Sequence, residues 1–214
     1  MNSQSRIVAV AAAFLLFLSA DVVAAPATSE AGLIGKPYAG VDFTYFGYSG
    51  SRYDQAPGGS AKFNVPLSPK YDLGFSYDYS DVSGDQLNLS KHAASLSLLT
   101  YNRNEYGRAY FSGSIGHAWD RVTLAGVSDR DNGMIWSVRA GYEVPMGERT
   151  AVNAGIGYAD SFDSRTARND TIDFRVEASH WLNRNLAGIV SGSYHQIKDA
   201  PDAILYTIGL RWLY

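Results

Sequence analysis

Apolar and polar residues alternate along most of the chain from Lys36 to the C-terminus. Over residues 71–80 the odd positions are Tyr, Leu, Phe, Tyr and Tyr, whereas the even positions are Asp, Gly, Ser, Asp and Ser. Side chains of a β-strand point alternately to opposite faces, so this period of two indicates a strand with one apolar and one polar face. The same pattern predicts ten strands, over residues 36–48, 59–66, 71–80, 87–101, 107–119, 133–145, 149–159, 169–182, 185–196 and 203–214.

Two of these segments are less regular than the rest. In the fourth, Leu89 and Leu96 lie on opposite parities, and this change of phase predicts a β-bulge near residues 92–94. The ninth segment, residues 185–196, is nearly apolar on both faces. A misreading of the second, fourth or ninth segment would leave eight or twelve strands instead of ten.

The connections between the segments alternate in length. Short ones lie at residues 66–70, 102–106, 145–148 and 183–184, and mostly longer ones lie at 49–58, 81–86, 120–132, 160–168 and 197–202. Short turns at one end and longer loops at the other are typical of membrane barrels, and each strand of about 10 residues is long enough to cross the apolar layer. We therefore predict an all-β, closed, antiparallel up-and-down transmembrane β-barrel of about ten strands, with both termini on the periplasmic, short-turn side.

The composition of the two faces favours a membrane barrel over a soluble one. A soluble barrel would turn its apolar face inward and cover its outer surface with Lys and Glu, of which this chain has few. We expect the apolar face to lie against lipid and the charged residues of the polar face to pair inside the lumen. The predicted interior charges are Asp42, Asp78, Arg139, Glu143, Asp173, Arg175, Glu177 and Arg211.

All four tryptophans fall near the ends of predicted strands. Trp119 and Trp136 flank the longest predicted loop, whereas Trp181 and Trp212 lie near the short turns. Amphipathic rings favour the headgroup level of a bilayer, so these residues are expected to mark two aromatic belts.

The N-terminal region has the layout of an export signal. Arg6 precedes an apolar run over residues 7–20, and the small residues Ala24 and Ala25 follow. The run is too short for a membrane-spanning helix, which takes about 20 residues. We predict a secretory signal peptide over residues 1–24, a flexible lead over 25–35 and the barrel over 36–214. Cleavage after Ala24 is favoured because a cut one residue later would leave Pro26 directly behind it.

The last predicted strand carries a short pattern of its own. Thr207 is followed by Gly209 two positions on and by Trp212 and Tyr214 five and seven positions on. By this pattern, and by the alternation over residues 36–214, the chain resembles the small outer-membrane β-barrel proteins of Gram-negative bacteria, the class of OmpA-like, opacity-type and omptin-type barrels. The resemblance implies that the barrel-assembly machinery reads Thr207, Gly209, Trp212 and Tyr214, and that outer-membrane lipid and lipopolysaccharide surround the barrel. It singles out no family within that class.

The remaining composition narrows the chemistry. The chain has no cysteine and a formal net charge of −3, which exclude disulfides and thiol chemistry and give no indication of a nucleic-acid partner. His195, with Asp199 nearby, is the best candidate for an omptin-like pair, but no matching set of partners follows from the sequence, so no catalytic residue is predicted.

The predicted outer loops are rich in Asp and contain several Arg residues. Residues 129–133 are the best candidate for a calcium loop, yet Arg130 interrupts them, and we expect solvated loop tips without a metal or cofactor. The loop arginines form a second group, which we expect to be able to meet lipopolysaccharide phosphates: Arg52, Arg121, Arg165 and Arg168.

These observations predict an integral outer-membrane barrel without enzymatic activity, with a structural or surface-interaction role and a lumen plugged by paired charges. A narrow pore for ions or small solutes is the alternative, and a surface hydrolase is a third. The sequence specifies no extracellular ligand.

Overall fold

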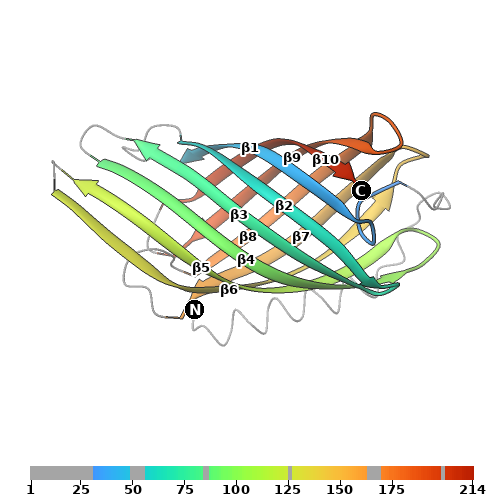
Figure 1. Ribbon diagram of the computed structural model, residues 1–214, viewed down its shortest axis with the longest axis horizontal. Coiled ribbons are helices and arrows are strands. Elements are labelled where there is room, and N and C mark those ends of the chain that lie inside the picture. The colour runs from blue at the N-terminus through green and yellow to red at the C-terminus, as the bar shows by residue number, and fades with distance from the viewer. Residues whose placement is uncertain (1–30, 49–55, 84–86, 125–126, 163–169, 199–200) are drawn as a thin grey trace.

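The computed structural model describes residues 31–48, 56–83, 87–124, 127–162, 170–198 and 201–214, which form a closed barrel of ten antiparallel strands (Figure 1). The predicted signal peptide and residues 25–30 lie outside these described residues. Among the described residues, no helix is long and apolar enough to cross a membrane. The strands are β1 (Tyr38–Tyr48), β2 (Ala56–Ser68), β3 (Tyr71–Ser83), β4 (Leu87–Arg103), β5 (Arg108–Leu124), β6 (Val127–Pro145), β7 (Thr150–Ser161), β8 (Thr171–Trp181), β9 (Leu186–Ile197) and β10 (Ala203–Leu213).

Every strand pairs with its neighbours in sequence, and β1 closes the sheet by pairing with β10. The closing register is continuous from Tyr38 opposite Leu213 to Tyr48 opposite Ala203. Closure leaves no unpaired sheet edge, so all backbone donors and acceptors along the wall can be satisfied within the chain. The predicted up-and-down barrel is confirmed, with ten strands and not eight or twelve.

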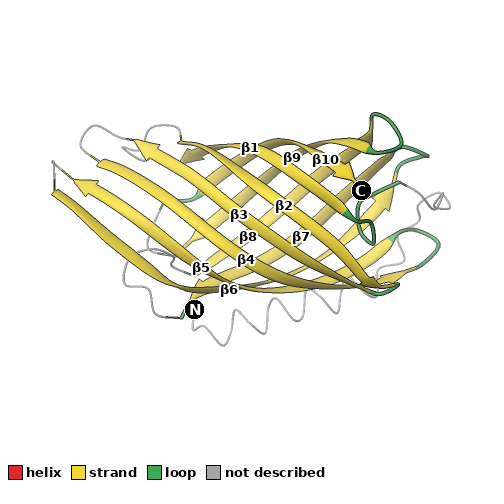
Figure 2. Ribbon diagram, viewed as in Figure 1, coloured by secondary structure: helices red, strands yellow, loops and turns green. Residues whose placement is uncertain are grey.

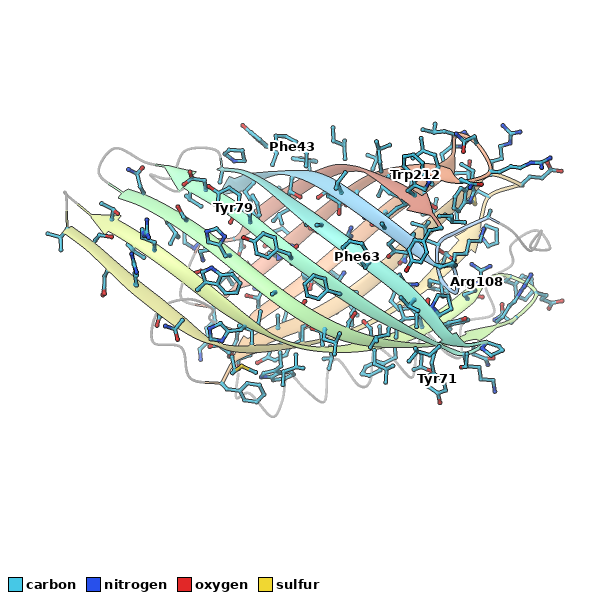
Figure 3. The ribbon with its side chains drawn as sticks, in the orientation of Figure 1. Phe43, Phe63, Tyr71, Tyr79, Arg108 and Trp212 are labelled. Atoms are coloured by element: carbon cyan, nitrogen blue, oxygen red, sulfur yellow. The ribbon has the colours of Figure 1, made fainter. Side chains whose placement is uncertain are left out.

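The period of two sorts the side chains of each strand between the two faces of the wall. Large apolar residues are exposed on the outer face, as Phe43 and Tyr71 show in Figure 3. On β10, Ile204, Tyr206, Ile208, Leu210 and Trp212 are all exposed on this face. Charged residues such as Asp42 and Arg211 are buried on the inner face. The apolar surface therefore faces away from the barrel axis, the arrangement on which the sequence prediction depends.

The predicted bulge in the fourth strand is wrong. The register of β4 runs without a shift against β3, from Tyr71 opposite Thr100 to Ser83 opposite Asn88, and likewise against β5. Within the described strands, the register shift lies instead between Pro66 and Ser68 in the pairing of β2 with β3. Proline cannot donate to the ladder, which explains why the irregularity lies there.

The predicted long loop over residues 120–132 is also wrong. Strand β5 has 17 residues and continues to Leu124, and β6 has 19 residues and begins at Val127. Both exceed the 9–11 residues that cross an apolar layer. The end of β5 and the start of β6 lie at the end of the barrel opposite the C-terminus and the short turns (Figure 2). We call residues 120–124 and 127–132 the projecting hairpin.

Candidate functional site

One charge network joins the two strands that close the barrel, β1 and β10, to β2, the other neighbour of β1. Arg211 on β10 donates from Nη1 to Oδ1 of Asp42 at 2.5 Å and from Nη2 to Oδ2 at 3.0 Å. Lys62 on β2 lies 2.8 Å from the same carboxylate, and the Ser60 hydroxyl donates to it at 3.1 Å. The side chains of Asp42 and Arg211 are 0% and 2% exposed. The two-point contact is the strong form of an arginine–carboxylate pair.

Strands β6 and β8 carry two further ion pairs. Arg139 on β6 lies 2.6 Å from Asp173 on β8, and Arg175 lies 2.5 Å from Glu177 on β8. Asp78 on β3 accepts a hydrogen bond from Ser76 at 3.0 Å. All eight predicted interior charges thus lie on the inner face, the last being Glu143 on β6. The pairs of Asp42 with Arg211 and of Arg139 with Asp173 join strands that the sequence alone could not match.

Arg108 and Lys62 belong to this interior set but were missed in the sequence. Arg108 opens β5 and lies 2.6 Å from Glu143. Arg108 shares the parity of Tyr110 and Ser112 and therefore lies on the face opposite to exposed Phe111. Lys62 in the same way lies on the face opposite to exposed Phe63. Both residues lie within the predicted strands 59–66 and 107–119, so the alternation there would have placed both on the inner face.

The residues before β1 enter the barrel at its short-turn end. Leu33 N donates to Glu143 Oε2 at 2.9 Å, and Gly35 N donates to Asp72 Oδ2 at 2.8 Å. The side-chain amide of Asn64 donates a hydrogen bond to Lys36 O at 2.9 Å and fixes the same stretch. The flexible lead predicted over residues 25–35 is therefore wrong for residues 31–35, because backbone donors and buried apolar side chains tie them to the wall. We call residues 31–36 the N-terminal segment.

A tight turn shapes this segment. Lys36 N donates to Leu33 O at 3.2 Å, and Gly35, third in the turn, has φ of +79°. A type II turn requires this left-handed conformation at its third residue, where glycine carries no steric cost. A Cβ at Gly35 would also lie 2.7 Å from the Tyr101 hydroxyl oxygen.

Trp181 packs inside the barrel, so its predicted place in an outer aromatic belt is wrong. It is 7% exposed and forms an apolar cluster with Leu33, Ala187 and Ile189. The Lys36 ammonium lies 4.5 Å from its ring centroid. The physical reason is parity: Trp181 shares the inner face of β8 with Glu177 and Ser179, and position at a strand end does not override that face.

The other tryptophans lie on the outer face. Trp212 is 65% exposed near the short turns. Trp136 packs on Tyr158 with ring centroids 5.4 Å apart. Trp119 is 37% exposed and stacks on His92 at 5.8 Å.

Further rings surround Trp119. His117 lies 5.9 Å from it, the Tyr77 hydroxyl is 2.7 Å from His92 Nδ1, and the Tyr79 ring is 4.9 Å from that of His92. We call Tyr77, Tyr79, His92, His117 and Trp119 the outer aromatic cluster.

The residues of the C-terminal pattern divide between the faces. Thr207 and Gly209 face inward, and the Thr207 hydroxyl is 3.1 Å from that of Thr44. A Cβ at Gly209 would overlap the Asp42 carboxylate, so glycine makes room for the Asp42–Arg211 pair. Trp212 and Tyr214 face outward and are exposed.

The structure brings Ser193 and His195 together on the inner face, with Ser193 Oγ 2.9 Å from His195 Nε2. Asp173 is the cross-strand neighbour of His195, but its Oδ1 binds Arg139. Asp199 lies outside the described residues. No group of three or more potential metal ligands occurs among the described residues. In residues 129–133 the side chains alternate between the faces of β6, because this stretch is strand and not loop.

Comparison with known proteins identifies the type of domain. Residues 10–179 match the family of the outer membrane protein beta-barrel domain. No curated protein matches the chain in sequence.

Among solved structures, the translocator domain of autotransporter NalP from Neisseria meningitidis aligns at a TM-score of 0.52 and 9% identity, over 99% of this chain and 94% of that one. The β domain of the Bordetella autotransporter Brka aligns at 0.52 and 11%, over 84% and 99%. The transport unit of AIDA-I from Escherichia coli aligns at 0.51 and 9%, over 95% and 97%. These similarities show the fold alone.

Proposed function

Because this chain belongs to the outer membrane protein beta-barrel domain family and is thus a barrel of the outer membrane, we propose that it has a closed lumen and works without catalysis, in a structural role or through surface contacts. The observation that carries the proposal is the N-terminal segment, whose Leu33 and Ile34 are 7% and 8% exposed inside the barrel end. Buried apolar side chains at the mouth of a barrel leave little room for a continuous water column.

The interior charges support the same proposal. A barrel of eight strands is just filled by side chains, whereas 16–18 strands leave a channel, so ten strands enclose a modest space. Ion pairs that cross from β1 to β10, from β5 to β6 and from β6 to β8 occupy this space. Paired charges satisfy one another and need no bulk water.

We place the short-turn end in the periplasm and the projecting hairpin outside the cell. The N-terminal segment and the C-terminal residue lie at the short-turn end, as expected for an even number of strands. Beyond Trp119, the outer-face positions of the projecting hairpin are polar, among them exposed Arg121, Ser128 and Arg130. A solvated β-ribbon of this kind suits contacts with other molecules at the cell surface.

Planar-bilayer recording tests the closed lumen. We expect the unmodified barrel to give no stable unit conductance. Replacing the two acceptors of the N-terminal segment, Glu143→Ala with Asp72→Ala, should release it and produce intermittent openings. Glu148→Gln, an exposed change in a short turn, is the matched control and should stay silent. Stable conductance steps from the unmodified protein would refute the closed lumen.

A narrow pore is the second candidate, and one observation favours it. Away from the N-terminal segment the inner face carries half-buried hydroxyl pairs, Ser76 with Ser95 at 2.9 Å and Ser114 with Ser137 at 2.6 Å. Small polar side chains of this kind leave wettable space. Under this proposal the unmodified barrel conducts, and the same recording separates the two candidates.

A further inference from the structure

The outer face of β5 changes character in steps toward the projecting hairpin. Phe111 and Ile115 are exposed apolar residues, Trp119 follows, and Arg121 is the next residue on the same face. At about 3.4 Å per residue, the Arg121 position lies about 7 Å beyond that of Trp119. A bilayer leaflet changes in the same order along its normal. Apolar residues match the acyl chains, aromatic residues match the interface, and arginines match the headgroup phosphates.

A second arginine stands directly beside Arg121. Arg130 on β6 is its cross-strand partner, and both side chains are exposed on the outer face. Opposite residues of an antiparallel pair lie about 5 Å apart, where like charges destabilise the pairing. Within the part of the chain that the structure describes, neither guanidinium has a hydrogen bond or ion pair. An anion bound between them would remove the repulsion.

The acidic residues nearby do not neutralise this pair. Asp129 and Asp131 flank Arg130 on β6 but belong to the inner-facing parity, and Asp129 accepts its hydrogen bond from the Arg130 backbone at 2.8 Å. Asp81 occupies the same row but lies two strands away from Arg121, where Tyr79 donates to it at 3.4 Å.

The outer aromatic cluster lies next to the two arginines, on the side that faces the apolar band. His92 and Trp119 are cross-strand partners with an interplanar angle of 3°, and Tyr79 is the next residue in their row. That row lies one outer-face step closer to the apolar band than Arg121 and Arg130. Flat amphipathic rings can pack against the faces of sugar rings while their polar atoms stay hydrated.

We propose that Arg121 and Arg130, above the outer aromatic cluster, bind the phosphate of a phosphorylated glycolipid in the outer leaflet. Two guanidinium groups match a phosphate through charge-assisted hydrogen bonds, the rings contact the sugar, and Phe111 and Ile115 continue the surface toward the acyl chains. The inference rests on the proposed orientation, because it requires the projecting hairpin to face the glycolipid leaflet. Of the arginines considered from sequence, Arg52, Arg165 and Arg168 lie outside the described residues.

Native mass spectrometry of the detergent-solubilised barrel tests the site, with purified bisphosphorylated lipid A as the probe. We expect the unmodified protein to retain this lipid, and each Arg→Gln change to weaken binding roughly tenfold, so that R121Q/R130Q binds about 100-fold more weakly. The control R103Q/R184Q removes two exposed arginines at the short-turn end and should bind as the unmodified protein does. Excess inorganic phosphate should not displace the lipid.

Equal binding by R121Q/R130Q and the unmodified protein would overturn the proposal, and so would equal retention of lipid A and its dephosphorylated form. Displacement by inorganic phosphate would overturn the glycolipid as occupant. Heat-dependent gel mobility checks that each variant is a closed barrel, and His92→Ala supplies a second variant that keeps both charges and should also weaken binding. Conductance of the unmodified barrel would refute the closed lumen separately, without affecting this result.

Discussion

The Asp42–Arg211 pair joins the first and last strands, so its loss should weaken the barrel at its closure. Arg211→Met removes both hydrogen bonds, at 2.5 and 3.0 Å, and leaves a buried carboxylate. Removing one partner of a buried ion pair costs about 3–5 kcal/mol. Lys62 at 2.8 Å and Ser60 at 3.1 Å remain on Asp42, so we expect the low end, about 3 kcal/mol.

A double-mutant cycle separates the pair from the packing around it. Asp42→Asn with Arg211→Met removes both charges and leaves Lys62, whose side chain is 23% exposed, with access to water. The double variant should therefore be less destabilised than Arg211→Met alone, because no uncompensated carboxylate stays buried.

Equilibrium urea unfolding of the barrel in detergent, followed by tryptophan fluorescence, measures these changes. Arg184→Met, at an exposed turn, is the control and should change the free energy of unfolding by about 0.5 kcal/mol or less. Additive effects of the two single changes, or a cost of Arg211→Met below about 1 kcal/mol, would refute a stabilising interaction between Asp42 and Arg211 across the closing strands.

The remaining predictions concern single side chains. Trp181→Ala should destabilise the barrel by about 3–5 kcal/mol in the same unfolding assay, since it empties the cluster around Leu33, whereas Trp212→Ala on the exposed face should cost clearly less; equal costs would contradict the inward position. Tyr214→Ala should slow assembly, measured as the fraction of heat-modifiable barrel after export, and unchanged kinetics would remove it from the assembly signal. His195→Ala should leave protease and lipid A deacylase assays at the background shown by the unmodified protein; activity that disappears with His195 would revive the surface hydrolase.

The alternation of side chains determined most of the fold. A period of two that returns after every turn specifies strands with one apolar face, and ten antiparallel strands with short connections can satisfy all their backbone groups only by closing. The parity of Asp173, Arg175 and Glu177 likewise determined that these charges share the inner face. The same parity indicates the inward position of Trp181, although its place near a strand end is also typical of an aromatic belt.

Only the tertiary structure decided which interior charges pair and where the segments without a period of two lie. Alternation assigns a face but no partner, so the pairing of Arg139 with Asp173 across two strands follows only from the register around the closed wall. The N-terminal segment has no strand pattern, and its place inside the barrel depends on Glu143 and Asp72, far away in sequence. The projecting hairpin escaped prediction because strands that leave the membrane lose the apolar constraint on their outer face, so the pattern fades while the hydrogen-bonded ladder continues.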